Sequence, residues 1–225
     1  MKHLSIIVPT LNEAERIEHT LSALQELRFH GAEVIVVDGG SRDDTVALAV
    51  PWVDRLLHSP CGRANQMNAG AAAAEGEVLL FLHADTLLPS RADRLILAAL
   101  TKSGQVWGRF DVHIAGRPGM LRLIAHMMNW RSRLTGIATG DQAMFVRRDV
   151  FAEIGGVPEQ PLMEDIELSV LLKRISPPLC LRSTVVTSGR RWETRGIWRT
   201  ILLMWLLRLA YFLGVPPEVL ARCYR

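Results

Sequence analysis

The chain has 225 residues, of which 49% are hydrophobic and 22% charged, and its formal net charge is +3. This length is enough for one well-cored domain with additional elements and short for two ordinary domains, and the composition is that of a globular protein. The three cysteines lie far apart without a CxxC spacing, which argues against a structural zinc site and for a reducing compartment.

The N-terminal segment predicts the first of several strand–helix units. Residues 4–8 are mostly apolar and strand-like, and we expect Pro9 to stop this strand. We expect a helix to open at residues 12–15, because the apolar residues that follow recur at helical spacing. These apolar residues are Ile17, Leu21, Leu24 and Leu27. Residues 1–3 show no secretory signal pattern, so we expect a cytoplasmic protein.

Two further strands repeat this design, and each ends on polar residues. Residues 33–38 predict a buried strand that ends on Asp38 and runs into a flexible turn at 39–45. Residues 78–82 predict another buried strand, followed directly by His83-Ala84-Asp85. Strands that alternate with helical segments predict an α/β fold with a mostly parallel sheet and ligands at the carboxyl ends of the strands. No GxGxxG motif follows the first strand, so a dinucleotide-binding Rossmann site is not expected.

His83 and Asp85 are candidate ligands for a divalent metal ion, Mn²⁺ or Mg²⁺. At the end of a parallel strand, this spacing directs an imidazole and a carboxylate toward one crevice. A metal ion that carries a diphosphate needs only one or two protein ligands, because phosphate oxygens and waters complete its octahedron. The structural alternative is that Asp85 caps the next helix and His83 is an ordinary loop histidine.

The segment between the second and third units contains two candidate nucleotide contacts. Arg63 is suited to pair with a phosphate, and Asn68 is suited to hydrogen-bond a nucleotide through its amide. Both are equally explained as surface residues. The alanine run at residues 71–74 predicts a closely packed helix.

The second half of the chain changes pattern. It predicts a strand at residues 105–114, a helix rich in methionine and aromatic residues at 120–130, and a polar turn at 140–142. Three acids precede a helix that we expect at residues 168–175. These acids are Glu164, Asp165 and Glu167. Acids at a helix N-terminus interact favourably with the helix dipole, so a structural explanation stands beside a catalytic one.

The C-terminal segment carries the basic charge of the chain. Residues 182–225 contain eight arginines and two glutamates, a net charge of +6, which leaves −3 for residues 1–181. This asymmetry favours an anionic surface or a phosphate as a partner, with a solvated charged face as the alternative. Residues 197–215 are mostly apolar, but Arg199 and Arg208 argue against a transmembrane helix. We expect an amphipathic helix at a membrane interface or in a homodimer contact, with packing on its own domain as the alternative.

Four motifs, in their order and spacing, resemble the family 2 inverting glycosyltransferases of the GT-A fold. The motifs are Ile7 to Glu13, Val37 to Thr45, Leu82 to Thr86 and Met163 to Asp165. The resemblance covers residues 4–192 and implies a Rossmann-like GT-A domain at 1–192 with a basic and apolar helical extension at 193–225. Within the family, the chain looks most similar to small single-domain members, including a subfamily associated with radical-SAM and arsenosugar gene clusters.

This resemblance implies a role for each matching position. Asp165, with Glu164 beside it, matches the general base. Asp85 matches the last acid of the DxD metal motif, in which His83 stands where the first acid is usual. Nucleotide-sugar contacts are implied for Pro9, Thr10, Glu13, Asp38, Arg63, Asn68, Ala84 and Asp85. Acceptor or leaving-group contacts are implied for Asp141, Gln142, Arg190, Arg191 and Trp192.

The predicted function is therefore transfer of a sugar from a UDP-sugar donor to a hydroxyl acceptor, either a small molecule or lipid-linked. Such a single displacement needs a base for the acceptor proton and a cation for the departing diphosphate. The first alternative is a nucleotidyltransferase, which typically has a Gly-rich, Lys-containing loop after its first strand that this chain lacks. The second is a non-catalytic nucleotide-sugar-binding protein. We expect no nucleic-acid partner and a cytoplasmic protein, peripheral at the inner face of the membrane.

Overall fold

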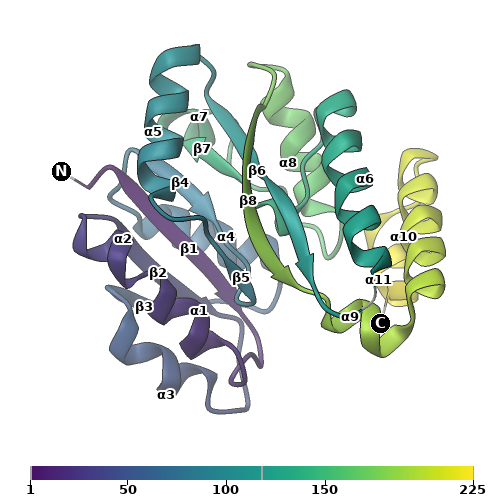
Figure 1. Ribbon diagram of the computed structural model, residues 1–225, viewed down its shortest axis with the longest axis horizontal. Helices are drawn as coiled ribbons and strands as arrows, with labels where there is room; N and C mark the ends of the chain where they lie inside the picture. The colour runs from purple at the N-terminus through teal and green to yellow at the C-terminus, as the bar shows by residue number, and fades with distance from the viewer. Residues whose placement is uncertain (1, 118, 225) are drawn as a thin grey trace.

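A computed structural model describes residues 2–117 and 119–224, which fold around one mixed β-sheet with helices on both faces (Figure 1). The sheet order in these residues is β3-β2-β1-β4-β7-β6-β8-β5. The strands are β1 (Leu4–Thr10), β2 (Glu33–Asp38), β3 (Arg55–His58), β4 (Val78–Phe81), β5 (Thr86–Leu87), β6 (Trp107–Ala115), β7 (Phe145–Arg147) and β8 (Leu179–Ser188).

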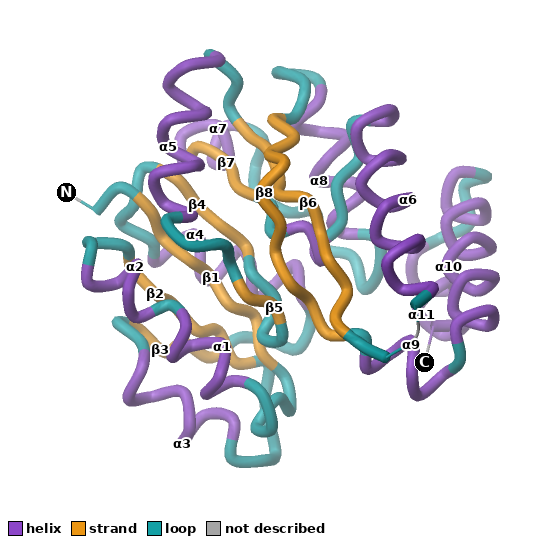
Figure 2. Tube along the Cα trace, in the orientation of Figure 1, coloured by secondary structure: helices purple, strands orange, loops and turns teal. Residues whose placement is uncertain are grey.

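Short helices join the strands of the N-terminal half, and longer helices flank the C-terminal half (Figure 2). The α-helices are α1 (Ile17–Ala23), α2 (Gln25–Phe29), α3 (Thr45–Ala49), α4 (Arg63–Ala73), α5 (Ala92–Ser103), α6 (Met120–Thr135), α7 (Arg148–Glu153), α8 (Glu164–Lys173), α9 (Arg190–Arg195), α10 (Ile197–Phe212) and α11 (Pro217–Tyr224). Two 3-10 turns are η1 (Val50–Trp52) and η2 (Gly140–Gln142).

The sheet has a parallel half and a mixed half. Strands β3, β2, β1 and β4 run parallel, so their carboxyl ends meet at one edge. Strand β7 is antiparallel to both β4 and β6, while β6 pairs in parallel with β8. Four of the seven strand pairings in the described residues are parallel, as predicted for a mostly parallel sheet. The polar residues that follow β1, β2 and β4 therefore lie along a common rim.

Two hydrophobic cores fill the space on either side of the sheet. Ile6 and Val8 of β1 pack on one face with α1, α5 and α6, whereas Ile7 packs on the other face with α4, α7 and α8. This division follows from the alternation of side chains along a strand that is buried on both faces. The apolar residues predicted at helical spacing, from Ile17 to Leu27, are all buried in the first core.

The prediction that Pro9 stops the first strand is wrong. Strand β1 continues to Thr10, and Pro9 pairs with Val37 of β2. Residues two apart in a strand direct their backbone groups to the same side, so Pro9 faces the β4 side as Ile7 does. The β1–β4 ladder has already ended at Ile7 and Phe81. The missing N–H of Pro9 therefore leaves no partner in β4 unsatisfied.

Two helix starts also differ from the prediction. Helix α1 begins at Ile17 and not at residues 12–15, because the backbone of Glu13 and Ala14 is held by side chains of the β2–α3 turn. Helix α8 begins at Glu164, four residues before the predicted start. The acids Glu164, Asp165 and Glu167 thus lie inside its first turn and not ahead of it.

The C-terminal helices pack against the rest of the chain through a third apolar cluster. Leu207 of α10 and Leu220 of α11 are buried there with Ile166 of α8. The Tyr211 hydroxyl also donates a hydrogen bond to Glu167 Oε2 at 2.6 Å. Within the described residues, no helix is long and apolar enough to cross a membrane. One face of α10 therefore covers its own domain, while several large apolar side chains on the helix stay exposed.

Gly70 on α4 offers a test of how closely this helix packs on the sheet. A Cβ at this position would lie 2.4 Å from Ile7 Cγ2 and 3.1 Å from Val37 Cγ2. We expect Gly70→Val to lower the free energy of unfolding by at least about 2 kcal/mol, because overpacking a dense core typically costs about 1–3 kcal/mol. Ala72→Val, on the exposed side of the same helix, should cost no more than about 0.7 kcal/mol. Urea unfolding measures both, and equal losses would contradict close packing at Gly70.

Candidate active site

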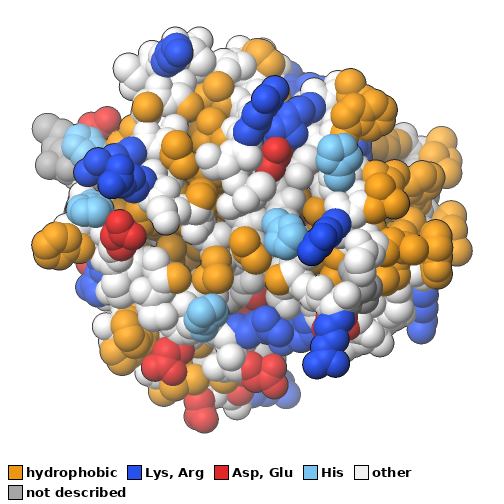
Figure 3. Space-filling view, in the orientation of Figure 1, with side chains coloured by type: hydrophobic (Ala, Val, Ile, Leu, Met, Phe, Trp, Pro, Cys, Tyr) orange, Lys and Arg blue, Asp and Glu red, His pale blue; other side chains and the backbone are white. Residues whose placement is uncertain are grey.

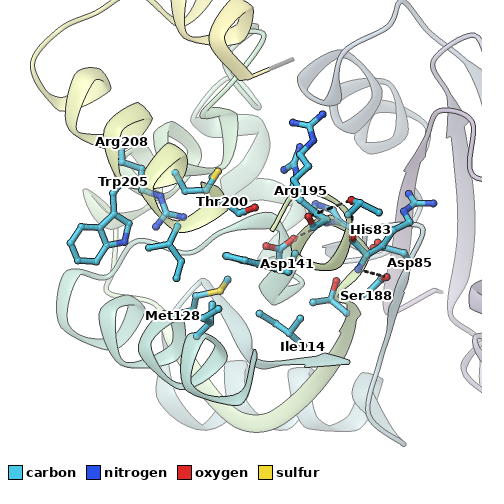
Figure 4. A pocket seen from close by; sticks show the side chains of 18 of the residues that line it. His83, Asp85, Ile114, Met128, Asp141, Ser188, Arg195, Thr200, Trp205 and Arg208 are labelled. Atoms are coloured by element: carbon cyan, nitrogen blue, oxygen red, sulfur yellow. Dashed lines mark hydrogen bonds and ion pairs between the residues drawn. The ribbon is translucent and has the colours of Figure 1, made fainter. Parts of the chain in front are cut away.

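A large cavity opens at the carboxyl edge of the parallel strands and continues between α6 and α10. Its volume is about 1530 Å³. In Figure 4, His83 and Asp85 lie at one end, Asp141 lies between, and Trp205 and Arg208 lie at the other end. The first end belongs to the sheet and the second to the C-terminal helices, so the cavity joins the two halves of the chain.

Most of the predicted site residues line this cavity, although they come from segments far apart in the sequence. Those that line it are Pro9, Thr10, Glu13, Arg63, His83, Ala84, Asp85, Asp141, Arg190, Arg191 and Trp192. Five predicted residues are not part of its lining. These are Asp38, Asn68, Gln142, Glu164 and Asp165.

His83 and Asp141 form an ion pair across the cavity wall. His83 Nδ1 lies 3.2 Å from Asp141 Oδ1. The other ring nitrogen, Nε2, packs against Gly140, where an added Cβ would lie only 2.3 Å away. The end of β4 and the η2 turn can therefore approach this closely only because residue 140 is a glycine.

The surroundings of Asp141 favour its ionised form. Removal from water raises its pKa, but the hydrogen bond and charge of His83, followed by the charges of Arg63 and Arg191, lower it by more. The resulting pKa of Asp141 is about 2. Asp141 is thus a fixed negative charge in the middle of the cavity at neutral pH.

Glu13, Asp85 and Arg190 form a second charged group at the strand edge. Arg190 Nη2 lies 3.3 Å from both carboxylate oxygens of Glu13, which joins the loop after β1 to the start of α9. Burial raises the pKa of Glu13, the charge of Arg190 opposes this rise, and the charge of Asp85 adds to it. The two carboxylates therefore repel each other, and a cation bound between them would relieve that repulsion.

Arg63 connects the cavity to the acidic first turn of α8. Its Nη1 lies 3.5 Å from Glu164 Oε1. Glu164 is buried, and this burial, together with the charge of Asp165, raises its pKa. Asp165 is half-buried, and its Oδ2 accepts a hydrogen bond from the Gly140 N–H at 2.9 Å. The same turn that packs on His83 thus also orients the Asp165 carboxylate.

The other three predicted residues outside the cavity lining are Asp38, Asn68 and Gln142, and their side chains bind neighbouring backbone groups. Asp38 is buried, and it accepts hydrogen bonds from the N–H groups of Gly40 and Ser41 at 2.8 and 2.9 Å. Burial raises its pKa, but the hydrogen bond from the Ser41 hydroxyl, followed by these backbone hydrogen bonds, holds the pKa below its usual value. The Asn68 amide bonds both backbone groups of Val157, at 2.8 Å each. The Gln142 side chain is fully buried within the η2 turn.

Several residues at the cavity escaped the sequence analysis. Gln66 is buried, and its Nε2 donates to the carbonyls of Thr10 and Val37 at 2.8 Å, which ties the ends of β1 and β2 together. Its side chain packs closely on the Gly39 turn, where an added Cβ would lie 3.1 Å from Gln66 Cδ. Gly39 was the one indication in the sequence of a close approach at this turn. Arg131 of α6 and Arg208 of α10 also line the cavity. An arginine on an apolar helix gives no indication in the sequence that it faces another one.

The residues at the strand edge fit a divalent cation in part. Within residues 2–117 and 119–224, no group of three or more metal-ligating side chains comes together. His83 is poorly suited as a ligand, since Nδ1 is paired with Asp141 and Nε2 packs on Gly140. Asp85 lines the cavity and carries the oxygen chemistry that Mg²⁺ and Mn²⁺ prefer. A single carboxylate ligand from the protein is enough for an ion that is held mainly by the oxygens of a diphosphate.

Comparison with known proteins assigns the family. A model described as glycosyl transferase family 2 matches residues 5–155, well over half of the chain. The chain belongs to this family. A curated relative, the probable glycosyltransferase YdaM of Bacillus subtilis (strain 168), is 25% identical over an alignment of 219 positions that covers 87% of this chain and 52% of YdaM. This family 2 chain therefore spans about half the length of that relative.

Solved structures share the fold of this family 2 chain. The TarS structure from S. aureus superposes with a TM-score of 0.67 at 19% identity, covering 85% of this chain and 61% of that one. The mannosyltransferase PcManGT from Pyrobaculum calidifontis, in complex with GDP-Man and Mn²⁺, gives a TM-score of 0.66 at 23% identity, covering 99% and 68%. At this identity the likeness concerns the GT-A fold, and it confirms the predicted α/β architecture.

The ion pair at the η2 turn predicts a specific change in titration. We expect His83→Ala to raise the pKa of Asp141 from about 2 toward its usual value of 3.8, because the hydrogen bond and charge of His83 are lost. A lowered folded-state pKa stabilises the fold above the unfolded value, and that stability is lost as pH falls through the folded value. The contribution of Asp141 is therefore complete above pH 3.8 and lost toward pH 2.

Carboxyl-carbon NMR titration of the wild type and of His83→Ala measures this pKa directly. Asp149, whose pKa is lowered by Arg147 at a separate surface position, is the internal control and should titrate identically in both proteins. An Asp141 titration that is unchanged in His83→Ala would contradict the ion pair.

Proposed function

We propose that this family 2 protein is an inverting glycosyltransferase that transfers a sugar from a UDP-sugar donor to a hydroxyl acceptor by a single displacement. The observation that supports this most is the η2 turn. Its Asp141 lines the cavity beside His83, and its Gly140 N–H holds Asp165. The residues proposed to bind the UDP-sugar, at the strand edge, and the proposed base, at the start of α8, are thereby linked through one short turn.

The acceptor side rests on Asp165 as the general base. Its two carboxylate oxygens accept backbone N–H groups, Oδ2 from Gly140 and Oδ1 from Ile166, so the side chain is held in one orientation. A fixed carboxylate can take the acceptor proton as the hydroxyl attacks the anomeric carbon. Glu164, paired with Arg63, keeps that arginine beside the base. The proton moves from the acceptor oxygen to Asp165 while the bond to the departing diphosphate breaks.

The donor side rests on the strand edge. The loop after β1 and the residues after β4 line the region where a nucleotide would lie, with Thr10 and Glu13 in the first and Asp85 in the second. Arg190 provides a cation near the leaving diphosphate, and it is already held there by Glu13. A divalent ion on Asp85, when bound, would neutralise the charge that develops on the diphosphate. TarS structures in complex with UDP and with UDP-GlcNAc support UDP as the nucleotide.

Replacement of the base gives the first test of this function. We expect Asp165→Asn to lower the turnover of UDP-sugar transfer by about 10²–10⁴-fold, the usual contribution of a general base, and to leave UDP affinity unchanged. Turnover is measured with a panel of UDP-sugars and calorimetry measures UDP binding. Glu153→Gln, at an exposed acid of α7, is the matched control and should keep full activity. Wild-type turnover in Asp165→Asn would remove this residue from the role of base.

The two candidate metal ligands are separated by a second test. We expect Mn²⁺ to strengthen UDP binding to the wild type and to His83→Ala, but not to Asp85→Asn, because Asp85 carries the cavity-facing carboxylate and the His83 nitrogens are engaged. Titration calorimetry with UDP, in Mn²⁺ and in a chelator, measures the difference. If His83→Ala loses the Mn²⁺ effect while Asp85→Asn retains it, the assignment is reversed.

A further inference from the structure

The cavity is larger than a sugar nucleotide requires. Pockets for single small ligands and cofactors usually measure about 300–1,000 Å³, whereas this cavity measures about 1530 Å³. The additional volume lies away from the strand edge, between α6 and α10, where Met128 and Trp205 face each other (Figure 4). A second molecule therefore has room beside the donor.

The walls of this second region are strongly apolar and reach the molecular surface. Trp198, Leu202 and Trp205 of α10 are each more than 60% exposed, and all three line the cavity. Trp130 of α6 is exposed to a similar degree on the opposite wall. Figure 3 shows hydrophobic side chains gathered over α10 at the edge of the molecule. Contiguous exposed apolar surface of this kind on a folded domain usually marks a binding site.

Two arginines within these apolar walls have guanidinium nitrogens that lack a hydrogen-bond partner in the described part of the chain. Among the described residues, Nε and Nη2 of Arg131 and Nε of Arg208 are shielded from solvent and donate no hydrogen bond. Buried donors without acceptors are rare in folded proteins and destabilise them. Burial, followed by the charge of Arg208, lowers the pKa of Arg131 to about 10, so it stays cationic at neutral pH. Both arginines line the cavity, so this region carries positive charge and guanidinium donors that the described residues do not use.

These arginines line the same cavity as Asp141, whose neighbour Gly140 binds Asp165. The charges of Asp141 and Asp165 act on both Arg131 and Arg208. An anion bound by the arginines would therefore occupy the cavity that Asp141 lines. A planar guanidinium binds the oxygens of phosphate or carboxylate with two parallel hydrogen bonds, which fixes the orientation of the bound group.

We infer that the region between α6 and α10 is the acceptor subsite, and that the acceptor is an amphiphile whose anionic oxygen group binds Arg131 and Arg208 while its hydrocarbon chain lies along Trp205. This inference rests on the proposed function only where it calls the bound molecule the acceptor. The binding site itself requires no transfer reaction.

Charge and access favour a single amphiphile over other occupants of the apolar surface. A second copy docking through α10 would bring together two C-terminal segments of net charge +6, which repel each other. A flat lipid surface would contact the exposed tryptophans, but it would not enter the cavity that Arg131 and Arg208 line. Only an anion carried on a chain that enters the cavity satisfies both the apolar walls and the arginines.

Calorimetry with decyl phosphate, used below its micelle-forming concentration, tests this inference on the full chain without any donor. We expect decyl phosphate to bind at least about tenfold more tightly than either inorganic phosphate or uncharged decyl maltoside, because both parts of the site are then used. Arg131→Gln and Arg208→Gln should each weaken decyl phosphate binding by at least about tenfold, a loss of about 1.4 kcal/mol. Trp205→Ala should weaken decyl phosphate but leave inorganic phosphate unchanged.

Matched controls separate the site from a general effect of charge or hydrophobicity. Arg122→Gln on α6 and Arg199→Gln on α10 remove the same charge at exposed positions outside the cavity, and Phe212→Ala removes an exposed aromatic of α10. All three should bind decyl phosphate like the wild type. Circular dichroism and thermal melts confirm that each variant is folded before it is scored.

Three results would overturn the inference. The first is equal loss of binding in the control and cavity variants, and the second is a dimer in solution that Trp205→Ala dissociates. The third is binding to neutral vesicles that is as strong as binding to decyl phosphate. UDP binding, measured on the same samples, distinguishes the two proposals: intact UDP binding without decyl phosphate binding removes the subsite and keeps the donor site. Decyl phosphate binding without UDP binding removes the donor site instead.

Discussion

The contact between His83 and the η2 turn holds the two sides of the cavity together. His83 follows a strand of the parallel half, and the turn follows α6 and precedes the antiparallel strand β7. Gly140 allows the imidazole to pack on its backbone, donates its N–H to Asp165, and leads directly into Asp141. Any side chain at residue 140 would push the turn away from β4. The Gly140 N–H group that binds the Asp165 carboxylate would move with the turn.

The parallel half of the sheet was predictable because short-range sequence patterns determine it. Strands that are mostly apolar along their length must be covered on both faces. The helical segment with apolar residues from Ile17 to Leu27 covers one of these faces. The rim that carries Thr10, Asp38 and Asp85 follows from strand direction alone. Strand β3 and the two-residue strand β5 were missed, because segments that short carry too little periodicity to be distinguished from loops.

The site was predictable in composition but not in contacts. The resemblance to family 2 found residues that gather around the cavity, but it could not show that Asp38 is enclosed by its own turn or that Asn68 fastens the loop before α8. The presence of Arg131 and Arg208 in one cavity was inaccessible for another reason. The two residues are far apart in the sequence, and they line the same cavity because α6 and α10 both border it. Tertiary packing creates that arrangement.

Position 83 holds a histidine where the motif that the sequence resembles usually has an acid, and this changes the electrostatics of the strand edge. An acid at position 83 would face Asp141 at close range, and two carboxylates there would repel each other and raise one another's pKa. The imidazole instead pairs with Asp141 and helps to keep it ionised, so negative charge is moved from the strand edge toward the centre of the cavity. With fewer acids at this edge, the protein alone binds a free metal ion more weakly. A divalent ion would then depend more on the oxygens of the nucleotide diphosphate, and its binding would be coupled to donor binding.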